Sequence, residues 1–304
     1  MTARIIGTGS YIPEKVITNE DLTKLVDTSD EWITSRTGIK KRHITNDGTT
    51  FMAAKAAKRA CADAGIIPAD LDIIILATTT ADHCFPSGAC EVQGVIGAVN
   101  AVAFDISAAC SGFIYALHIL NGFFKAGLYK TGLVIGAESL SKLMDWKDRS
   151  TCVLFGDGAG AAVVQAEDLG IMETRLYSDG SKTEVLNCKT QIYMNGQEVF
   201  KFAVKKVPES IEEVLASARI EKEAVKYFIL HQANERIIAS VAKRLEISMD
   251  KVPLNISEYA NTSAASIPIL LDELNREHKL NKGDLLVLSG FGAGLTWGTT
   301  LLAW

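Results

Sequence analysis

Short apolar runs alternate with amphipathic stretches along most of this chain. The segment Leu71–Ala77, LDIIILA, is apolar at nearly every position, which is typical of a strand buried on both faces of a parallel sheet. The stretch before it, Thr49–Gly65, is rich in alanine and ends at a glycine, which predicts a closely packed helix. The alternation continues to the C-terminus and predicts an α/β protein. Further strands are expected at residues 4–10, 133–137 and 151–155, and further helices after Asn19, which would act as a cap, and at residues 29–38.

One predicted strand-to-helix junction contains a candidate catalytic residue. Ala101–Leu117 opens as a short apolar run with β-branched residues and continues with helical spacing of its apolar side chains. Cys110 falls at the turn between the two. A helix N-terminus favours thiolate over thiol, and small neighbours leave room for a second molecule to reach the sulfur. These are the conditions for a nucleophilic cysteine, with a buried structural cysteine as the alternative. The small neighbours are Ser107, Ala108, Ala109, Ser111 and Gly112.

The second half of the chain repeats the pattern of the first. CADAGIIPADLDIIILA (Cys61–Ala77) aligns without gaps with LASARIEKEAVKYFILH (Leu215–His231). Each half also ends with a strand that leads into a glycine loop, at Val153–Val164 and Val287–Gly298. Two repeats in the same order indicate a duplicated domain, with a mostly parallel sheet and covering helices in each copy. We expect one half at residues 1–168 and the other at residues 169–304.

Composition narrows the class of protein. The chain has 304 residues, 48% of them hydrophobic and 22% charged, as in an ordinary soluble globular protein. A net charge of −5 argues against a general nucleic-acid binder. No apolar run is long enough to span a bilayer, and no signal peptide is expected at Met1–Ile12. The six cysteines include no C-x-x-C pair, so we expect a reduced, cytoplasmic protein without a metal site.

Three other segments carry candidate chemistry. His231 directly follows the apolar run YFIL, at the strand end where parallel sheets bind ligands; a buried neutral histidine is the alternative. Asn261 opens the segment NTSAASIPILLDEL and is either a site residue or a helix N-cap. The loop Gly290–Gly294 lacks the lysine of a phosphate-binding loop. It favours a close backbone approach, or an N–H group aimed at an oxyanion.

Four motifs connect these positions: DISAACSGF around Cys110, HQAN at His231–Asn234, NTSAAS at Asn261–Ser266 and GFGAGLTWG at Gly290–Gly298. Together they resemble the β-ketoacyl-acyl carrier protein synthase III family. GDGAGAAV, HCFPSGAC and the opening GTGSYIPEKVITNEDL support the same resemblance, which runs from Arg4 to Trp304. It implies a thiolase-like fold of two duplicated αβαβα halves with mixed, mostly parallel sheets, and a homodimer.

The resemblance also implies an activity. The family condenses a short acyl-CoA, acetyl-CoA by default, with malonyl-acyl carrier protein in the initiating step of type II fatty acid synthesis, releasing CO₂ and CoA. By motif match, Cys110 is the acylated nucleophile, and His231 and Asn261 complete the catalytic set. The backbone N–H groups of Cys110 and Ala293 would form the oxyanion hole. No cofactor is implied, because acyl-CoA and the malonyl carrier are substrates.

Binding residues follow from the same resemblance. The residues expected to hold the CoA arm are Trp32, Arg36, Arg149 and Asn234. The acyl pocket is expected to involve Phe85, crossing from the partner subunit, with Leu154, Phe155 and Met194. The residues expected to dock the acidic carrier protein are Gln232, Ala233, Asn234, Glu235, Arg236, Lys201, Lys243 and Arg244. Two positions depart from the family pattern: Gln197, where asparagine is frequent, and Glu235, an acid on the docking surface.

Other functions remain open at this stage. A biosynthetic thiolase would need a second cysteine late in the chain, and the last one here is Cys188. A condensing enzyme of polyketide or alkylquinolone type would share the fold. A non-catalytic acyl-CoA-binding subunit would not need the intact Cys, His and Asn set. A cysteine thioester hydrolase would use the same thiolate without the asparagine.

Overall fold

The computed structural model describes residues 2–168 and 170–304, which form two main sheets. The first sheet has five strands in the order β1-β7-β6-β4-β5: β1 (Thr2–Tyr11), β7 (Gly158–Glu167), β6 (Thr131–Glu138), β4 (Ile73–Ala77) and β5 (Val102–Ile106). The second has four in the order β11-β12-β13-β8: β11 (Val225–Leu230), β12 (Leu285–Gly292), β13 (Thr296–Ala303) and β8 (Met172–Ser178). The expected boundary between the halves falls at Leu169, which lies outside the described residues.

Both sheets are mixed. In the first, β4 runs parallel to β5 and β6, whereas β7 is antiparallel to β6 and β1. In the second, β11 and β12 are parallel, whereas β13 is antiparallel to β12 and β8. The prediction of mixed sheets is therefore confirmed, whereas the prediction that they are mostly parallel is wrong. Strands buried on both faces are apolar throughout whichever way they run, so the apolar runs did not reveal their direction.

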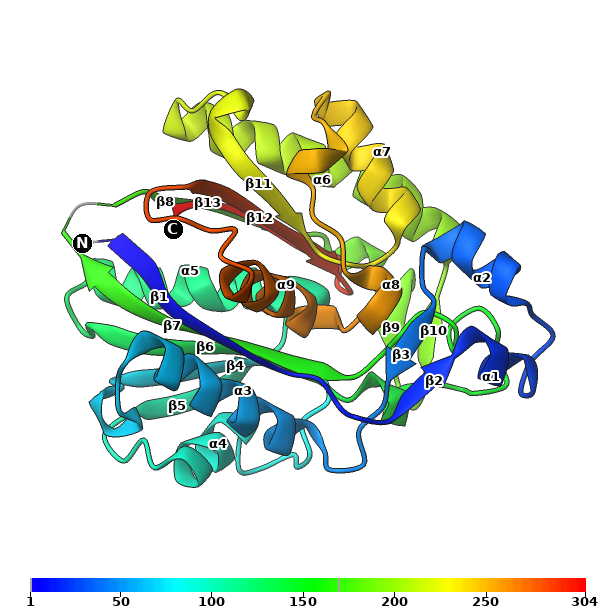
Figure 1. The fold of residues 1–304 in the computed structure, drawn as a ribbon, viewed down its shortest axis with the longest axis horizontal. Helices are drawn as coiled ribbons and strands as arrows, with labels where there is room; N and C mark the ends of the chain where they lie inside the picture. The colour runs from blue at the N-terminus through cyan, green and yellow to red at the C-terminus, as the bar shows by residue number, and fades with distance from the viewer. Residues whose placement is uncertain (1, 169) are drawn as a thin grey trace.

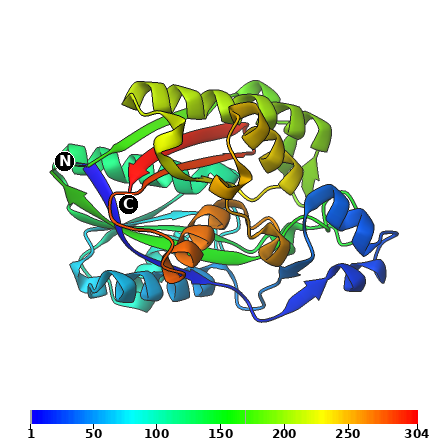
Figure 2. The ribbon, with the colours of Figure 1, turned by 45° about the horizontal axis from the view of Figure 1, so that its top comes forward.

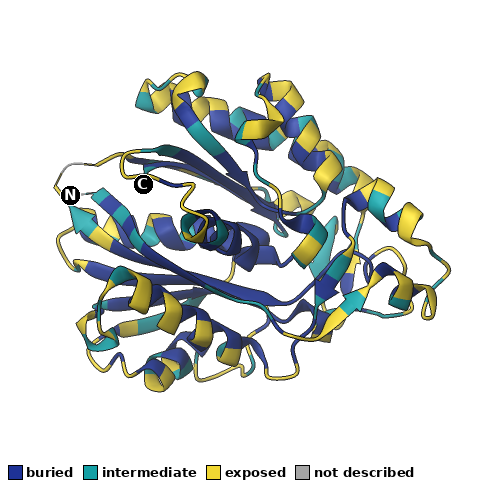
Figure 3. Ribbon diagram, viewed as in Figure 1, coloured by how far each residue is buried: buried dark blue, intermediate teal, exposed yellow. Residues whose placement is uncertain are grey.

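The elements stack in five layers (Figure 1). Helices α5 (Gly112–Lys125) and α9 (Ser266–Arg276) lie between the two sheets, a position that they keep in the turned view of Figure 2. Helices α3 (Thr49–Ala64) and α4 (Gly88–Ile96) cover the outer face of the first sheet, and α6 (Gly196–Ala218) and α7 (Glu235–Leu245) cover the second. The strands and central helices are mostly buried, whereas the outer helices expose one side (Figure 3).

Small residues bring α3 close to the first sheet. The helix turns a face of alanines and Met52 inward and ends at Gly65, which adopts a left-handed conformation with φ of 67°. A Cβ atom on Gly7 of β1 would come within 2.7 Å of the Ala64 side chain, so the close approach requires glycine there. Among the residues that the structure describes, no helix is both long and apolar enough to cross a membrane.

A lobe of short elements closes the right-hand end of the molecule in Figure 1. It contains β2 (Val16–Thr18) paired with β3 (Lys41–His43), β9 (Leu186–Cys188) paired with β10 (Ile192–Met194), and the helices α1 (Asn19–Thr23), α2 (Asp30–Thr37) and α8 (Ile256–Tyr259). The cap of α1 is Thr18, which forms a capping box with Asp21. Asn19 is instead the first helical residue and donates to the Ile39 carbonyl, which corrects the expected cap by one position.

The apolar run at residues 151–155 is not a strand, contrary to the prediction. It forms turns that pack in an apolar cluster with Leu22, Ile33 and Leu140. Only Phe155 makes a β-bridge, with Asn261. The fully buried Arg42 donates to the Val153 carbonyl at 3.0 Å and holds this loop in place. The run is apolar because it packs in this cluster, and Leu154 and Phe155 also line a cavity.

Candidate active site

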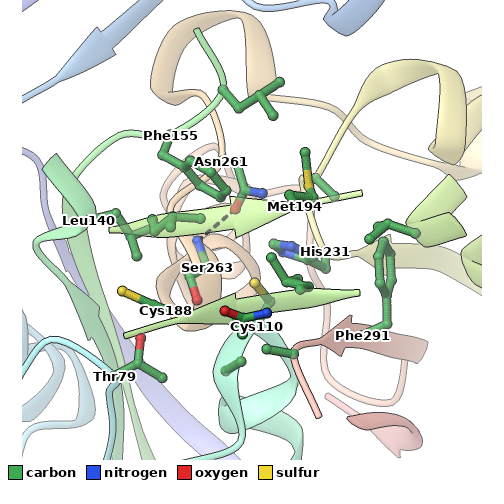
Figure 4. A pocket seen from close by; sticks show the side chains of 18 of the residues that line it. Thr79, Cys110, Leu140, Phe155, Cys188, Met194, His231, Asn261, Ser263 and Phe291 are labelled. Atoms are coloured by element: carbon green, nitrogen blue, oxygen red, sulfur yellow. Dashed lines mark hydrogen bonds between the residues drawn. The ribbon is translucent and has the colours of Figure 1, made fainter. Parts of the chain in front are cut away.

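A cavity of about 540 Å³ opens between the two sheets and the lobe. Cys110, His231 and Asn261 all line it, although they come from three separate segments of the chain. Figure 4 shows their side chains around one space, with Ser263 and Phe291 beside them. The structure thus brings together the three side chains that the sequence singled out.

Cys110 lies in the 3₁₀ turn η2 (Ala109–Ser111), between β5 and the first turn of α5. The backbone is held tightly there: Ala109 has φ of 45°, and a Cβ atom on Gly292 would lie 2.6 Å from the Cys110 nitrogen. Burial raises the pKa of the Cys110 thiol to about 12, against a hydrogen bond with Ser263 that lowers it. Burial therefore favours the thiol, whereas the position at a helix N-terminus led us to expect the thiolate.

His231 follows β11, as expected, and is 2% exposed. Its Nδ1 atom lies 2.6 Å from the Ser266 hydroxyl, and its ring meets that of Phe291 edge-on at 5.6 Å between centroids. Burial lowers the pKa of the imidazole to about 3. The ring is therefore neutral at physiological pH and can donate one hydrogen bond into the cavity.

Asn261 connects the lining loop to the central helix layer. Its N–H donates to the Leu154 carbonyl at 2.9 Å, and its own carbonyl accepts from Gly156 at 3.0 Å. The side-chain oxygen accepts from the Ser263 N–H at 2.9 Å, which is the contact expected of a cap or Asx turn. With the oxygen engaged in this way, the amide nitrogen is the part of the side chain left to donate into the cavity.

The two expected oxyanion donors are neighbours. Ala293 lines the cavity just after β12, and the preceding Gly292 packs against the backbone nitrogen of Cys110. A side chain at position 292 would separate these backbones. The glycine loop therefore permits a close backbone approach, which was one of the two expectations for it.

The expected CoA residues meet where α2 approaches α7. The guanidinium groups of Arg36 and Arg149 lie 4.5 Å and 4.7 Å from the centroid of the Trp32 ring. Asn234 caps α7 and donates to the Arg36 carbonyl at 3.0 Å, and it also lines the cavity. The four residues therefore form one continuous surface from the α2 helix to the cavity. Glu235 packs over Gly38 at the end of α2.

The other predicted positions include residues that line the cavity, one that is exposed and one that is buried away from it. Leu154, Phe155 and Met194 line the cavity, whereas Phe85 is 86% exposed and does not. Gln232 is fully buried, donates to the Leu230 carbonyl and accepts from Asn255. It cannot face a carrier protein, and that assignment is corrected.

The charged docking positions lie on the outer helices. Lys201 pairs with Glu198 at 2.8 Å, and Arg244 lies 3.8 Å from Glu209. Glu235, Arg236 and Lys243 are exposed on α7, while Ala233 is half-buried beside the cavity. The basic character of this face therefore rests mainly on Arg236 and Lys243.

Sequence reasoning missed several residues of the site. Ser263 and Ser266 stand within the NTSAAS motif, but nothing in the sequence assigned them contacts. Glu138 closes the apolar strand TGLVIGAE as its only charged residue, which was a usable signal of a buried polar role. The hydrophobic lining residues not predicted include Leu140, Val199 and Phe200.

Comparison with known proteins agrees with this geometry. The family profile of 3-oxoacyl-[acyl-carrier-protein (ACP)] synthase III matches residues 104–180, and that of its C-terminal part matches residues 215–304. The chain is 50% identical to β-ketoacyl-[acyl-carrier-protein] synthase III of Clostridium acetobutylicum, over 100% of this chain and 99% of the relative. The corresponding protein of Aquifex aeolicus is 55% identical, over 99% of both.

Solved structures show the same similarity. The crystal structure of 3-oxoacyl-[acyl-carrier-protein] synthase III from Aquifex aeolicus superposes with a TM-score of 0.98 at 53% identity, over 99% of this chain and 100% of that one. The chain belongs to the β-ketoacyl-[acyl-carrier-protein] synthase III family, the initiating condensing enzymes of type II fatty acid synthesis.

Proposed function

We propose that this chain transfers a short acyl group from acyl-CoA to Cys110 and condenses it with malonyl-acyl carrier protein. The observation that carries the proposal is the convergence of Cys110, His231 and Asn261 on one cavity from three segments of the chain. A hydrolase would need the cysteine, but it would not need two neutral donors beside it. Those donors suit a reaction in which negative charge develops on oxygen without a proton being removed.

In the first half-reaction, the Cys110 thiol gives up its proton as the sulfur attacks the thioester carbonyl of the acyl donor. The carbonyl oxygen takes the negative charge, and the N–H groups of Cys110 and Ala293 are the proposed donors to it. The bond from carbon to the CoA sulfur then breaks. CoA leaves as a thiolate that takes a proton from solvent, and the acyl group stays on Cys110.

In the second half-reaction, the malonyl carboxylate leaves as CO₂ and its electron pair forms an enolate. The enolate oxygen accepts hydrogen bonds from neutral His231 and from the Asn261 amide. The enolate carbon then attacks the acyl group, and Cys110 is expelled as a thiolate and reprotonated. Removing one donor should cost roughly 2–4 kcal/mol of barrier.

Substrate binding follows the surface described above. Adenine stacking on Trp32 and phosphate pairing with Arg36 and Arg149 would hold CoA, since guanidinium groups pair well with phosphates. Asn234 would contact the pantetheine arm. Leu154, Phe155 and Met194 would enclose the acyl chain, with acetyl as the default primer. Arg236 and Lys243 on α7 would attract the acidic carrier.

The proposed assembly is a homodimer with a thiolase-like, duplicated fold. The pairing order β1-β7-β6-β4 in the first sheet matches β8-β13-β12-β11 in the second, with the same pairs antiparallel and parallel. This match supports halves at residues 1–168 and 169–304. Among the residues that the structure describes, β5 at the edge of the first sheet pairs with β4 alone. Val102 of β5 and Phe85 are 49% and 86% exposed. An open strand edge beside exposed apolar side chains supports a second copy there.

A cytoplasmic location is the expectation that goes with exposed, unpaired Cys84, Cys90 and Cys188.

The two half-reactions test the proposal separately. Cys110→Ala should abolish acylation by acyl-CoA. His231→Ala and Asn261→Ala should retain acylation but lose roughly 10²–10³-fold in CO₂ release from malonyl-acyl carrier protein. Cys152→Ala, a buried cysteine outside the cavity lining, is the matched control and should keep both. Acyl loss to water at the same rate with and without the malonyl carrier would favour the hydrolase instead.

A further inference from the structure

Glu138, at the end of β6, is a buried carboxylate that the reaction above does not use. It is 0% exposed, and it accepts hydrogen bonds from the Thr79 N–H at 3.2 Å and from the hydroxyls of Thr80 at 2.6 Å and Ser263 at 3.2 Å. Its partners among residues 2–168 and 170–304 are all neutral. Burial raises the pKa of this carboxyl to about 7. Glu138 can therefore gain or lose a proton near neutral pH.

Ser263 lies between this carboxylate and the nucleophile. Its hydroxyl donates to Oε1 of Glu138 at 3.2 Å, and the residue lines the cavity together with Cys110. Its N–H is fixed by Asn261, and the backbone is held at φ of 51°. Figure 4 shows Ser263 beside Cys110 at the cavity wall, with Thr79 on its other side. A hydroxyl that donates to a carboxylate has lone pairs left to accept the thiol proton.

We propose that Ser263 and Glu138 form a proton relay that removes the Cys110 proton as the sulfur attacks the acyl donor. The inference rests on the proposed function and adds a route for the proton. The thiol S–H bond breaks as the proton passes to the Ser263 oxygen, and the Ser263 proton passes to Glu138. Ser263 would contact the reacting sulfur, since both residues line the cavity, whereas Glu138 acts through Ser263 as a positioning residue and proton acceptor.

The proton then stays on Glu138 while Cys110 carries the acyl group. The departing CoA thiolate takes its own proton from solvent. A neutral Glu138 leaves no buried negative charge near the enolate that forms next, which favours decarboxylation. When condensation expels the Cys110 thiolate, the stored proton returns through Ser263, and the resting thiol and carboxylate are restored.

The surrounding groups leave Glu138 as the base suited to this role. His231 is a weak base, because burial lowers its pKa to about 3, and its Nδ1 is engaged by Ser266. A base is most effective when its pKa lies between those of the thiol before and after attack. The described elements packed against β6 carry further titratable or charged groups: Lys55, Lys58, Arg59, Cys61 and Asp63 on α3, Tyr115, His118 and Lys125 on α5, Asp272, Glu273 and Arg276 on α9, and Glu167 on β7. Neighbouring segments add Cys110 on η2, Asp157 before β7, and the paired Lys142 and Asp82.

The variant Glu138→Gln distinguishes loss of the proton relay from loss of the negative charge near Cys110. The negative charge of Glu138 raises the pKa of Cys110, so removing that charge alone would make the thiol more reactive. The relay predicts the opposite. Single-turnover acylation would be followed by rapid quench and intact mass between pH 5.5 and 9.5. The donor would be whichever of acetyl-, propionyl- or isobutyryl-CoA acylates the wild type fastest.

The wild-type rate should rise through an inflection near pH 7 and then level off. Glu138→Gln should lose this inflection and acylate roughly 10²–10⁴-fold more slowly at pH 8. Ser263→Ala should do the same, which keeps the test decisive if Glu138→Gln does not fold. The matched control is Asp157→Asn, another fully buried carboxylate bonded to Ser141 and Thr45, which should keep the wild-type profile.

Equal or faster acylation by Glu138→Gln, or an unchanged pH profile in Ser263→Ala, would overturn the relay alone. If the wild type itself formed no adduct on Cys110 with any donor, the proposed function would fall as well.

Discussion

The Nδ1 atom of His231 lies 2.6 Å from the Ser266 hydroxyl. The Ser266 oxygen also accepts from the Gln232 N–H at 3.4 Å, so its own proton is available to Nδ1. We therefore assign the ring proton to Nε2, the nitrogen that remains to donate into the cavity. A serine hydroxyl thus fixes the tautomer of a neutral histidine as the enolate donor requires.

Ser266→Ala should weaken the second half-reaction while leaving the first intact. Without the hydroxyl, both ring tautomers are populated, and the donor at Nε2 is lost part of the time. We expect CO₂ release from the malonyl carrier to fall roughly 10-fold, as for a lost hydrogen bond of about 1.4 kcal/mol. Stopped-flow acylation and ¹⁴CO₂ release measure the two halves. Ser210→Ala, a buried serine bonded to Val207 and Thr299, is the control, and an equal loss in both variants would refute the tautomer argument.

Arg149→Ala should impair binding of the CoA nucleotide and leave the chemistry unchanged. The exposed Arg149 guanidinium lies over the Trp32 ring, and Arg149 is outside the lining of the cavity that holds Cys110. We expect KM for acyl-CoA to rise about 10-fold with little change in kcat, which is the signature of lost uniform binding. An acyl-pantetheine donor, which lacks the nucleotide, should show no such change. The exposed neighbour Lys147→Ala is the control; a similar rise in KM for acyl-pantetheine would place Arg149 elsewhere.

Charge reversal on α7 should affect the carrier substrate alone. Arg236→Glu and Lys243→Glu reverse two of the exposed cations of that helix and leave Arg244, which lies 3.8 Å from Glu209. We therefore expect kcat/KM for malonyl-acyl carrier protein to fall roughly 10-fold while the acylation rate stays constant. Activity with the carrier should also fall as salt rises, because electrostatic steering is screened. Lys58→Glu on α3 serves as the control. Activity that does not change up to high salt would remove this docking surface.

The pH dependence of stability should report the buried charge of Glu138. Its pKa is raised from 4.5 to about 7 in the folded chain, so the folded state binds the proton more tightly than the unfolded state. Stability is therefore lost as pH rises from about 4.5 to 7. At pH 8 the cost is about 3 kcal/mol, from 1.4 kcal/mol per pKa unit.

Glu138→Gln cannot ionise, so its urea unfolding free energy should shift by up to about 3 kcal/mol in its favour, relative to wild type, between pH 5 and pH 8. The opposing effect of buried His231 is common to both proteins and cancels in this difference. Parallel stability curves for the two proteins would show that Glu138 titrates normally.

The sequence predicted the positions of the chemically important residues better than it predicted the directions of the strands. The position of Cys110 at a strand-to-helix turn and that of His231 after a strand follow from local patterns, and both were correctly predicted. The direction of β7 and β13 was not, because direction depends on long-range pairing that an apolar run does not encode. The loop at residues 151–155 was predicted to be a strand because burial makes a sequence apolar, whatever its secondary structure.

The sequence also did not predict side-chain contacts between residues that are far apart in the chain. Glu138 and Ser263 are far apart in the chain and meet because β6 ends beside the 3₁₀ turn η7 (Ser263–Ala265). Gln232 stands in a motif that resembles a docking surface, yet its side chain turns inward to the Leu230 carbonyl and the Asn255 N–H. Such choices depend on which backbone groups the fold leaves unpaired.

Intact mass spectrometry of the acylated enzyme tests the central claim most directly. The protein would be mixed with acetyl-, propionyl- and isobutyryl-CoA in turn, digested to map any adduct, and then chased with malonyl-acyl carrier protein. We predict one acyl group on Cys110 that is discharged only with the malonyl carrier and appears as β-ketoacyl carrier. An adduct on another residue, or one lost equally fast to water, would contradict the assignment of Cys110 as the nucleophile of a condensing reaction.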